Sequence, residues 1–138
     1  MNAAEPVLRL EAVGKSYQSP AGPVRVLDGV DLSVREGEFV AITGPSGSGK
    51  TTLINLAGLL DRPTSGRVFL DGHCLATDGS DAEARRLRRE RPGMVFQRFF
   101  LLPRRSVLDN VLFRFRYVRH DPIEARARAL AEIGRAHV

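Results

Sequence analysis

The residues with the clearest chemical potential lie in the stretch GPSGSGKTT, from Gly44 to Thr52. A glycine, four free positions and then Gly-Lys-Thr match the phosphate-loop pattern. Glycines let the backbone curl so that its N–H groups face an anion, and Lys50 supplies an ammonium for the β- and γ-phosphates. The Thr51 hydroxyl suits Mg²⁺. The predicted nucleotide-binding residues of this stretch are Gly44, Pro45, Ser46, Gly47, Ser48, Gly49, Lys50, Thr51 and Thr52.

The flanking segments decide whether this pattern belongs to a real phosphate site. Phe39–Thr43 is a short apolar run that predicts a buried strand, and the apolar run Leu53–Leu60 continues a helix that begins near Gly49. A helix start at this place directs its positive dipole end toward a bound anion. The alternative is a surface turn rich in glycine and serine, but it does not explain the flanking strand and helix. The segment therefore predicts binding of a nucleoside triphosphate.

The remaining elements follow from apolar periodicity and capping residues. Alternating runs predict strands at Val7–Val13, Val24–Val34 and Arg67–Leu70, and the turn-rich segment Lys15–Pro23 separates the first two. Asp28-Gly29 is compatible with a bulge or a tight hairpin, whereas Asp71-Gly72 predicts a turn. Met94–Gln97 predicts another buried strand. Helices are expected from Ser80 or Asp81 to Glu90, from Ser106 or Asp109 to Val118, and from Asp121-Pro122 to Gly134. Alternating strands and helices predict an α/β fold with a parallel sheet.

Composition sets broad limits. A chain of 138 residues with 43% apolar residues has room for one globular domain. Its net charge of +5 comes almost entirely from arginine, because Lys15 and Lys50 are the lysines of the sequence. The single cysteine, Cys74, cannot form an internal disulfide and fits a reducing compartment. With no secretory signal pattern and no long apolar stretch, we expect a cytoplasmic protein.

Several segments together resemble the ATP-binding subunit of ABC transporters. Leu27–Gly72 follows the core pattern of that family, and Met94–Val111 resembles its Q-loop region. The resemblance implies that Tyr17 stacks on the adenine ring of ATP, although a turn tyrosine packed on a strand edge remains an open alternative. It also implies that Gln97 approaches Mg²⁺ and the attacking water, so that Lys50 and Gln97 are the expected catalytic residues and Thr51 and Gln97 the expected metal-site residues.

The nearest likeness within the family is to the group that serves lipoprotein release and macrolide export. These sequences share the pattern LDRPTSG, present here from Leu60 to Gly66. The resemblance implies a membrane permease partner that contacts the Gln97–Val111 region, a second ATP-binding subunit in a dimer, and a peripheral position on the inner face of the cell membrane. Phe100 and Arg104–Ser106 depart from the family pattern, which affects the expected partner surface and not the nucleotide site.

The family motifs that follow the Q-loop are missing from the sequence. It contains no Leu-Ser-Gly-Gly-Gln signature and no apolar strand ending in Asp-Glu. We therefore expect residues 1–138 to form a partial ABC-type ATP-binding domain: an N-terminal antiparallel β region plus a P-loop core, truncated before the signature and the second acidic motif. Such a chain belongs to an ATP hydrolase family but is expected to hydrolyse little ATP alone. Asp71 is interpreted as a turn residue and not a metal ligand, and the histidines His73, His120 and His137 as surface residues.

Two further hypotheses remain open. A soluble ABC-type ATPase acting on nucleic acid or in cell division would use the basic cluster Arg85–Arg91. No aromatic residues are interleaved with that cluster, so nucleic acid is not the expected partner. The third hypothesis is a non-catalytic nucleotide-binding remnant.

Overall fold

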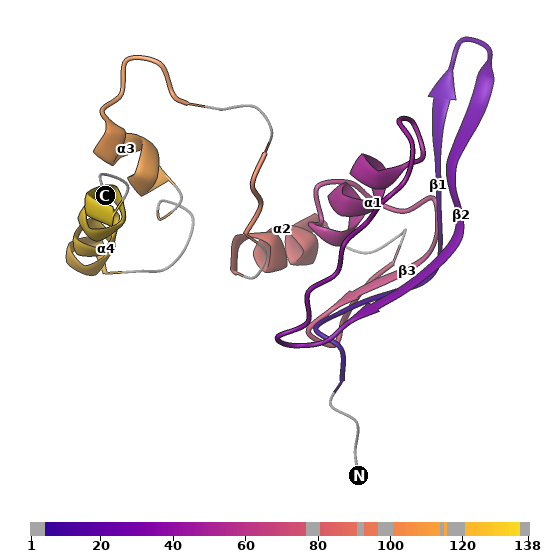
Figure 1. Cartoon of the computed structure of the whole chain (residues 1–138), viewed down its shortest axis with the longest axis horizontal. Coiled ribbons are helices and arrows are strands. Elements are labelled where there is room, and N and C mark those ends of the chain that lie inside the picture. The colour runs from indigo at the N-terminus through magenta and orange to yellow at the C-terminus, as the bar shows by residue number, and fades with distance from the viewer. Residues whose placement is uncertain are drawn as a thin grey trace. The chain divides into compact units, whose positions relative to one another are not determined.

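The computed structural model describes residues 5–76, 81–90, 93–96, 101–113, 115 and 121–135 (Figure 1). It divides into two compact units, Met1–Gly93 and Met94–Val138, each of which is described by itself. In its described residues, the first unit contains four strands and two helices. In chain order they are β1 (Leu8–Ser19), β2 (Gly22–Val34), α1 (Lys50–Ala57), β3 (Ser65–Leu70), β4 (His73–Ala76) and α2 (Asp81–Glu90).

The four strands form one antiparallel sheet in the order β2-β1-β3-β4. Strand β1 pairs on both sides, so Leu10 lies opposite Leu32 on β2 and Val68 on β3. Most of the segment predicted to be a turn belongs to β1, which continues to Ser19 and places Tyr17 opposite Val24. Pairing with β2 overrides the weak strand preference of these residues, because it satisfies their backbone hydrogen bonds.

Strand β1 has several register shifts, and two of them involve a glycine of the partner strand. Between Val13 and Lys15 the pairing with β2 gains one residue at Asp28-Gly29, which confirms the bulge over the hairpin. The pairing of β1 with β3 also shifts after Glu11, beside Gly66. A Cβ at Gly66 would collide with the carbonyl oxygens of Glu11 and Ala12, and its φ is +79°, so this crossing requires glycine. The antiparallel N-terminal region expected from the sequence is thus confirmed.

The core of the first unit lies between the sheet and helices α1 and α2. Its buried side chains are mainly leucines, with Leu56 of α1 and Leu87 of α2 among the most deeply buried. The cluster comprises Leu10, Val13, Leu27, Leu56, Leu59, Val68, Leu70 and Leu87. Burial of these side chains supplies most of the free energy that holds α1, and with it the stretch before α1, against the sheet.

The predicted strand at Phe39–Thr43 is wrong for this structure. These residues pair with no strand in the described ranges, and Phe39 is 91% exposed. The prediction for Met94–Gln97 fails likewise over Met94–Phe96, where Val95 is fully exposed, and Gln97 lies outside the described residues. An extended segment becomes a strand only when a neighbour accepts its backbone hydrogen bonds, and the sequence pattern does not supply that neighbour. The predicted parallel sheet is accordingly absent from the described part of the chain.

The helices begin close to their predicted positions. Helix α1 ends at Ala57, before the expected Leu60, because Leu59 adopts a left-handed φ of +57° and the Leu60 N–H bonds back to Asn55 O at 2.8 Å. Helix α2 occupies Asp81–Glu90 as predicted, whereas strand β4 was not predicted. The second unit holds α3 (Val107–Leu112) and α4 (Pro122–Arg135). A capping box between Ser106 and Asp109 begins α3, and residues 114 and 116–118 of its predicted extension lie outside the described part.

Candidate functional site

The glycine-rich stretch forms an exposed loop that ends at the start of α1. Three of its glycines have a positive φ: 151° at Gly44, 79° at Gly47 and 88° at Gly49. Gly49 occupies the N-cap position of α1 in a left-handed conformation. A Cβ there would lie 2.9 Å from Leu27 Cδ2 and 3.0 Å from Val26 O, so a larger residue would push the loop away from β2. Glycine is required at this position by both conformation and space.

No side chain caps the N-terminus of α1. The first N–H groups of a helix have no partner within the helix, and they carry the positive end of its dipole. At α1 these donors follow directly from the glycine loop, and Thr51 in the first turn has an exposed side chain. Unpaired backbone donors and an exposed hydroxyl therefore follow directly on the loop in the chain, and such donors at a helix start are suited to binding an anion.

The ammonium group of Lys50 closes the loop. Its Nζ donates hydrogen bonds to the carbonyl oxygens of Gly44 at 2.8 Å and Pro45 at 2.6 Å, and lies 3.3 Å from Ser48 Oγ. These bonds hold the positive charge at the loop, where it remains exposed to solvent. The loop residues Gly44, Pro45, Ser46, Gly47 and Ser48 are exposed, and Gly49 and Lys50 are half-buried. A cation held by exposed backbone at a helix start is suited to binding phosphate oxygens.

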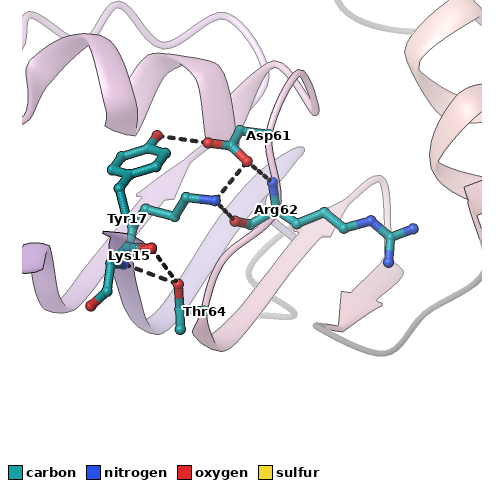
Figure 2. A network of polar contacts seen from close by, with 6 residues as sticks. Lys15, Tyr17, Asp61, Arg62 and Thr64 are labelled. Atoms are coloured by element: carbon teal, nitrogen blue, oxygen red, sulfur yellow. Dashed lines mark hydrogen bonds and ion pairs between the residues drawn. The ribbon is translucent and has the colours of Figure 1, made fainter. Parts of the chain in front are cut away.

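Tyr17 belongs to a polar network that the sequence did not reveal (Figure 2). Its hydroxyl donates to Asp61 Oδ2 at 2.7 Å, and Lys15 Nζ donates to Asp61 Oδ1 and to Arg62 O, each at 2.6 Å. The Lys15 ammonium also lies over the Tyr17 ring, 4.8 Å from its centroid. Close by, the backbone N–H of Ser16 donates to Thr64 Oγ1 at 3.0 Å. The network joins β1 to the segment between α1 and β3.

The protonation equilibria of Tyr17 and Asp61 reflect these contacts. The hydrogen bond to the Asp61 carboxylate raises the pKa of Tyr17 and burial acts in the same direction, whereas a hydrogen bond with Thr52 in α1 lowers it. For Asp61, burial acts to raise the pKa. Hydrogen bonds from Lys15, Tyr17 and the Arg62 N–H outweigh burial, so the pKa of Asp61 lies below its ordinary value. The pair therefore stays a neutral phenol and an ionised carboxylate at neutral pH.

Sequence reasoning found Tyr17 and the loop but missed Lys15, Asp61 and Thr64. Asp61 and Thr64 belong to DRPTSG, which was interpreted only as a turn after the helix. Nothing in the spacing links Asp61 to residues 44 and 46 positions earlier, and only the antiparallel pairing of β1 brings them together. The pattern LDRPTSG, which contributed to the family resemblance, was the one sequence signal that could have pointed to Asp61 and Thr64.

The expected metal-site residues are placed only in part. Thr51 lies at the loop, and Gln97 is outside the described residues. Within the described ranges, no group of three or more His, Cys, Asp or Glu side chains could hold a metal ion. Asp71 has a φ of +47° in the turn between β3 and β4, as expected of a turn residue, and His73 is exposed, whereas His120 and His137 lie outside the described part. A lone hydroxyl fits Mg²⁺, since this ion commonly combines one or two protein oxygens with water and phosphate.

The second unit carries the region expected to contact a permease. Asn110 of α3 forms hydrogen bonds with the Leu101–Ser106 segment. Its Oδ1 accepts from Leu102 N at 2.7 Å, and its Nδ2 donates to Ser106 O at 3.0 Å. An open hollow of about 490 Å³ lies beside it, lined by Leu102, Pro103, Arg105, Asp109, Leu112 and Phe113. Leu101 and Val107 are 71% and 67% exposed. None of the helices in the described ranges is long and apolar enough to cross a membrane.

A glycine loop closed by a lysine at an uncapped helix start defines the class of phosphate-loop nucleotide-binding proteins. The family model described as "ABC transporter" matches residues 27–137, and the chain belongs to this family. The chain is 46% identical over 129 residues to the macrolide export ATP-binding/permease protein MacB 1/2 of Paracoccus denitrificans. It is 44% identical over 108 residues to the lipoprotein-releasing system ATP-binding protein LolD of Hyphomonas neptunium.

The fold is that of an ABC cassette. A solved dimeric structure of the bacterial ABC transporter cassette MJ0796 superposes with a TM-score of 0.80 at 40% identity, covering 90% of this chain and 54% of that chain. A second structure of the same cassette, described as a post-hydrolysis state bound to ADP and Pi, gives a TM-score of 0.79. The alignments cover 92% of this chain for the Paracoccus protein and 78% for the Hyphomonas protein. The chain spans only 19% and 46% of the lengths of those relatives.

Proposed function

We propose that this chain is part of the ATP-binding domain of an ABC exporter, in which residues Gly44 to Thr52 bind the phosphates of Mg-ATP. The observation that carries the proposal is the Lys50 ammonium, held inside the loop by the Gly44 and Pro45 carbonyls at the uncapped start of α1. A triphosphate there would meet a fixed cation, the first N–H groups of α1 and the Thr51 hydroxyl.

Each part of the site has a distinct role in this proposal. Lys50 neutralises charge on the phosphates, and the loop N–H groups fix their position. The Thr51 hydroxyl would bind Mg²⁺, which supplies charge neutralisation at the phosphate oxygens. Tyr17 would stack on the adenine ring. Gln97 would orient the attacking water, which in the family is the step after nucleotide binding.

The partners follow from the family and the second unit. Relatives of this chain are named as ATP-binding/permease proteins, and the MJ0796 cassette is described as a dimer. We assign the permease contact to the Gln97–Val111 region, where exposed Leu101 and Val107 line a second open hollow of about 560 Å³. This hollow, which Arg105 also lines, suits a peptide segment at an anionic membrane surface. The domain would work with a second ATP-binding subunit, peripherally on the inner face of the membrane.

Binding of a fluorescent ATP analogue with Mg²⁺ tests the proposal. The wild-type chain is expected to give saturable binding, and Lys50→Ala is expected to reduce the affinity about tenfold or more, because it removes the cation that the loop holds. Arg135→Ala serves as the matched control, since it also removes one positive charge, from an exposed residue paired with Glu132 in α4. Equal binding by Lys50→Ala and wild type would overturn the assignment of the loop.

A further inference from the structure

The Tyr17 ring is held in one orientation by groups on two of its sides. Its hydroxyl is bonded to Asp61 Oδ2, and the ammonium of Lys15 covers one face. Tyr17 is nevertheless 40% exposed. The backbone N–H of Asp61 donates to Asn55 O of α1 at 3.3 Å, so the Tyr17 hydroxyl is linked through Asp61 to the helix that begins with Lys50.

Asp61 is the centre of this arrangement. Its two carboxylate oxygens accept bonds from different partners, Oδ2 from Tyr17 and Oδ1 from Lys15 and from the Arg62 backbone N–H. Bonds to both oxygens prevent the carboxylate from rotating, and therefore fix the direction in which the Tyr17 O–H points. The Lys15 ammonium is further anchored on Arg62 O, so it remains over the ring. The side chains of Lys15 and Tyr17 therefore both depend on Asp61 for their mutual geometry.

A fixed aromatic face improves binding of a flat ligand, because the ring has already lost the rotamer freedom that stacking would otherwise remove. Lys15 occupies one face, so a base can stack only on the other. We propose that Asp61 is a positioning residue for the nucleotide base: with Lys15 it locks Tyr17 so that one ring face is presented to adenine beside the phosphate loop. This inference rests on the proposed function, since it requires that nucleotide binds at Gly44–Thr52.

The competing explanation is that the network only tethers β1 to the segment before β3. The two explanations differ in which ligand they affect. A positioning role concerns the base alone. Loss of Asp61 would then weaken the binding of ATP and leave the binding of inorganic tripolyphosphate unchanged. A tether supports the whole site, so its loss weakens both ligands together.

The experiment measures displacement of the fluorescent analogue by ATP and by tripolyphosphate, with Mg²⁺, from the wild-type chain and its variants. Asp61→Asn keeps the shape of the side chain but removes its charge and one acceptor oxygen. It is expected to lower the affinity for ATP about fivefold without changing the affinity for tripolyphosphate. Tyr17→Phe, which keeps the ring and removes the anchored hydroxyl, is expected to give the same selective loss. The double variant is expected to lose no more than either single one, because both break one interaction.

Controls separate failure of this inference from failure of the proposed function. Asp28→Asn removes another carboxylate, one that pairs with Arg25 on β2, and is expected to leave both ligands unchanged. Lys50→Ala is expected to weaken both. The positioning role is overturned if Asp61→Asn binds ATP as tightly as wild type, or if it loses affinity for both ligands equally. In either case, weaker binding of both ligands by Lys50→Ala would still support the assignment of the loop. Should the wild-type chain bind neither ligand, both proposals fail. If Asp61→Asn does not fold, Tyr17→Phe decides the same question from the other side of the bond.

Discussion

The two lysines of this arginine-rich chain hold their charges in different ways. Lys50 Nζ donates hydrogen bonds to neutral carbonyl oxygens of the loop, and within the described residues none of its partners is a carboxylate. Lys15 Nζ forms an ion pair with Asp61, and the Lys15 side chain is 11% exposed. An unneutralised ammonium attracts phosphate, whereas a paired one orders its neighbours. The charge of Lys50 is therefore available to an anion, and that of Lys15 serves the geometry of Tyr17.

The Asp61 network makes stability depend on pH in a defined direction. The pKa of Asp61 is lowered in the folded chain, so its contribution is present above the ordinary aspartate pKa of about 3.9 and is lost as the pH falls through the lowered value. The pKa of Tyr17 is raised, so its contribution is present below the ordinary tyrosine pKa of about 10 and is lost as the pH rises through the raised value.

Urea unfolding of the wild-type chain and of Asp61→Asn checks this prediction. Wild type is expected to be the more stable at neutral pH, and the difference between the two midpoints is expected to shrink in acid, below the ordinary aspartate pKa of about 3.9. The comparison isolates one carboxylate, because all other titrating groups are shared. A midpoint difference that stays constant into acid would show that Asp61 does not hold a lowered pKa.

At the scale of elements, α1 links the core to the site. Its first residue is Lys50, and its seventh, Leu56, is fully buried in the leucine cluster beneath the sheet. Eight residues are too few for a stable isolated helix, so α1 depends on this packing. The position of the loop and of the helix N-terminus is thus set by an apolar side chain on the far end of the same helix.

Truncation of Leu56 is expected to destabilise the chain and the site together. Leu56→Ala leaves a cavity in the core and should lower the free energy of unfolding by about 2 to 5 kcal/mol. Ile54→Ala is the matched control, because Ile54 lies in the same helix and is 45% exposed. That change should cost well under about 1 kcal/mol, since alanine has the higher helix propensity. Denaturant midpoints measure both, and equal losses would contradict the packing role of Leu56.

The same elements show what could be predicted from the sequence. Helices α2 and α3 begin near polar capping candidates and α4 begins with Pro122 after Asp121, so local chemistry predicts where these helices start. Strands depend on distant neighbours. Phe39–Thr43 has a strand composition but no paired neighbour in the described ranges, whereas the polar segment around Tyr17 is a strand because β2 returns alongside it. Short apolar runs indicate burial, but the pairing that makes them strands is not encoded locally.

At the scale of the whole molecule, the loop could be predicted and the network around Tyr17 could not. The loop is contiguous, and its glycines, lysine and helix start depend on neighbours within ten residues. The network joins Lys15 and Tyr17 to Asp61 across the fold of the first unit. The chain nevertheless matches 90% of its length to a cassette of which it covers about half. It therefore contains the segment to which we assign the loop side of the nucleotide site, while the signature and the Asp-Glu strand are absent from its sequence.

This set of motifs predicts that residues 1–138 bind ATP but hydrolyse it very slowly. Binding needs the loop, Lys50 and the start of α1, all of which are present, whereas hydrolysis also needs a base that positions water and groups that stabilise the transferring phosphoryl. Phosphate release from Mg-ATP is the measurement, with Lys50→Ala as the background, and wild type is expected to stay within about twofold of that background. Fast release that disappears in Lys50→Ala would show that the chain supplies the hydrolytic groups itself. Release equally fast in both would instead identify a contaminating ATPase, because that activity would not depend on the loop lysine.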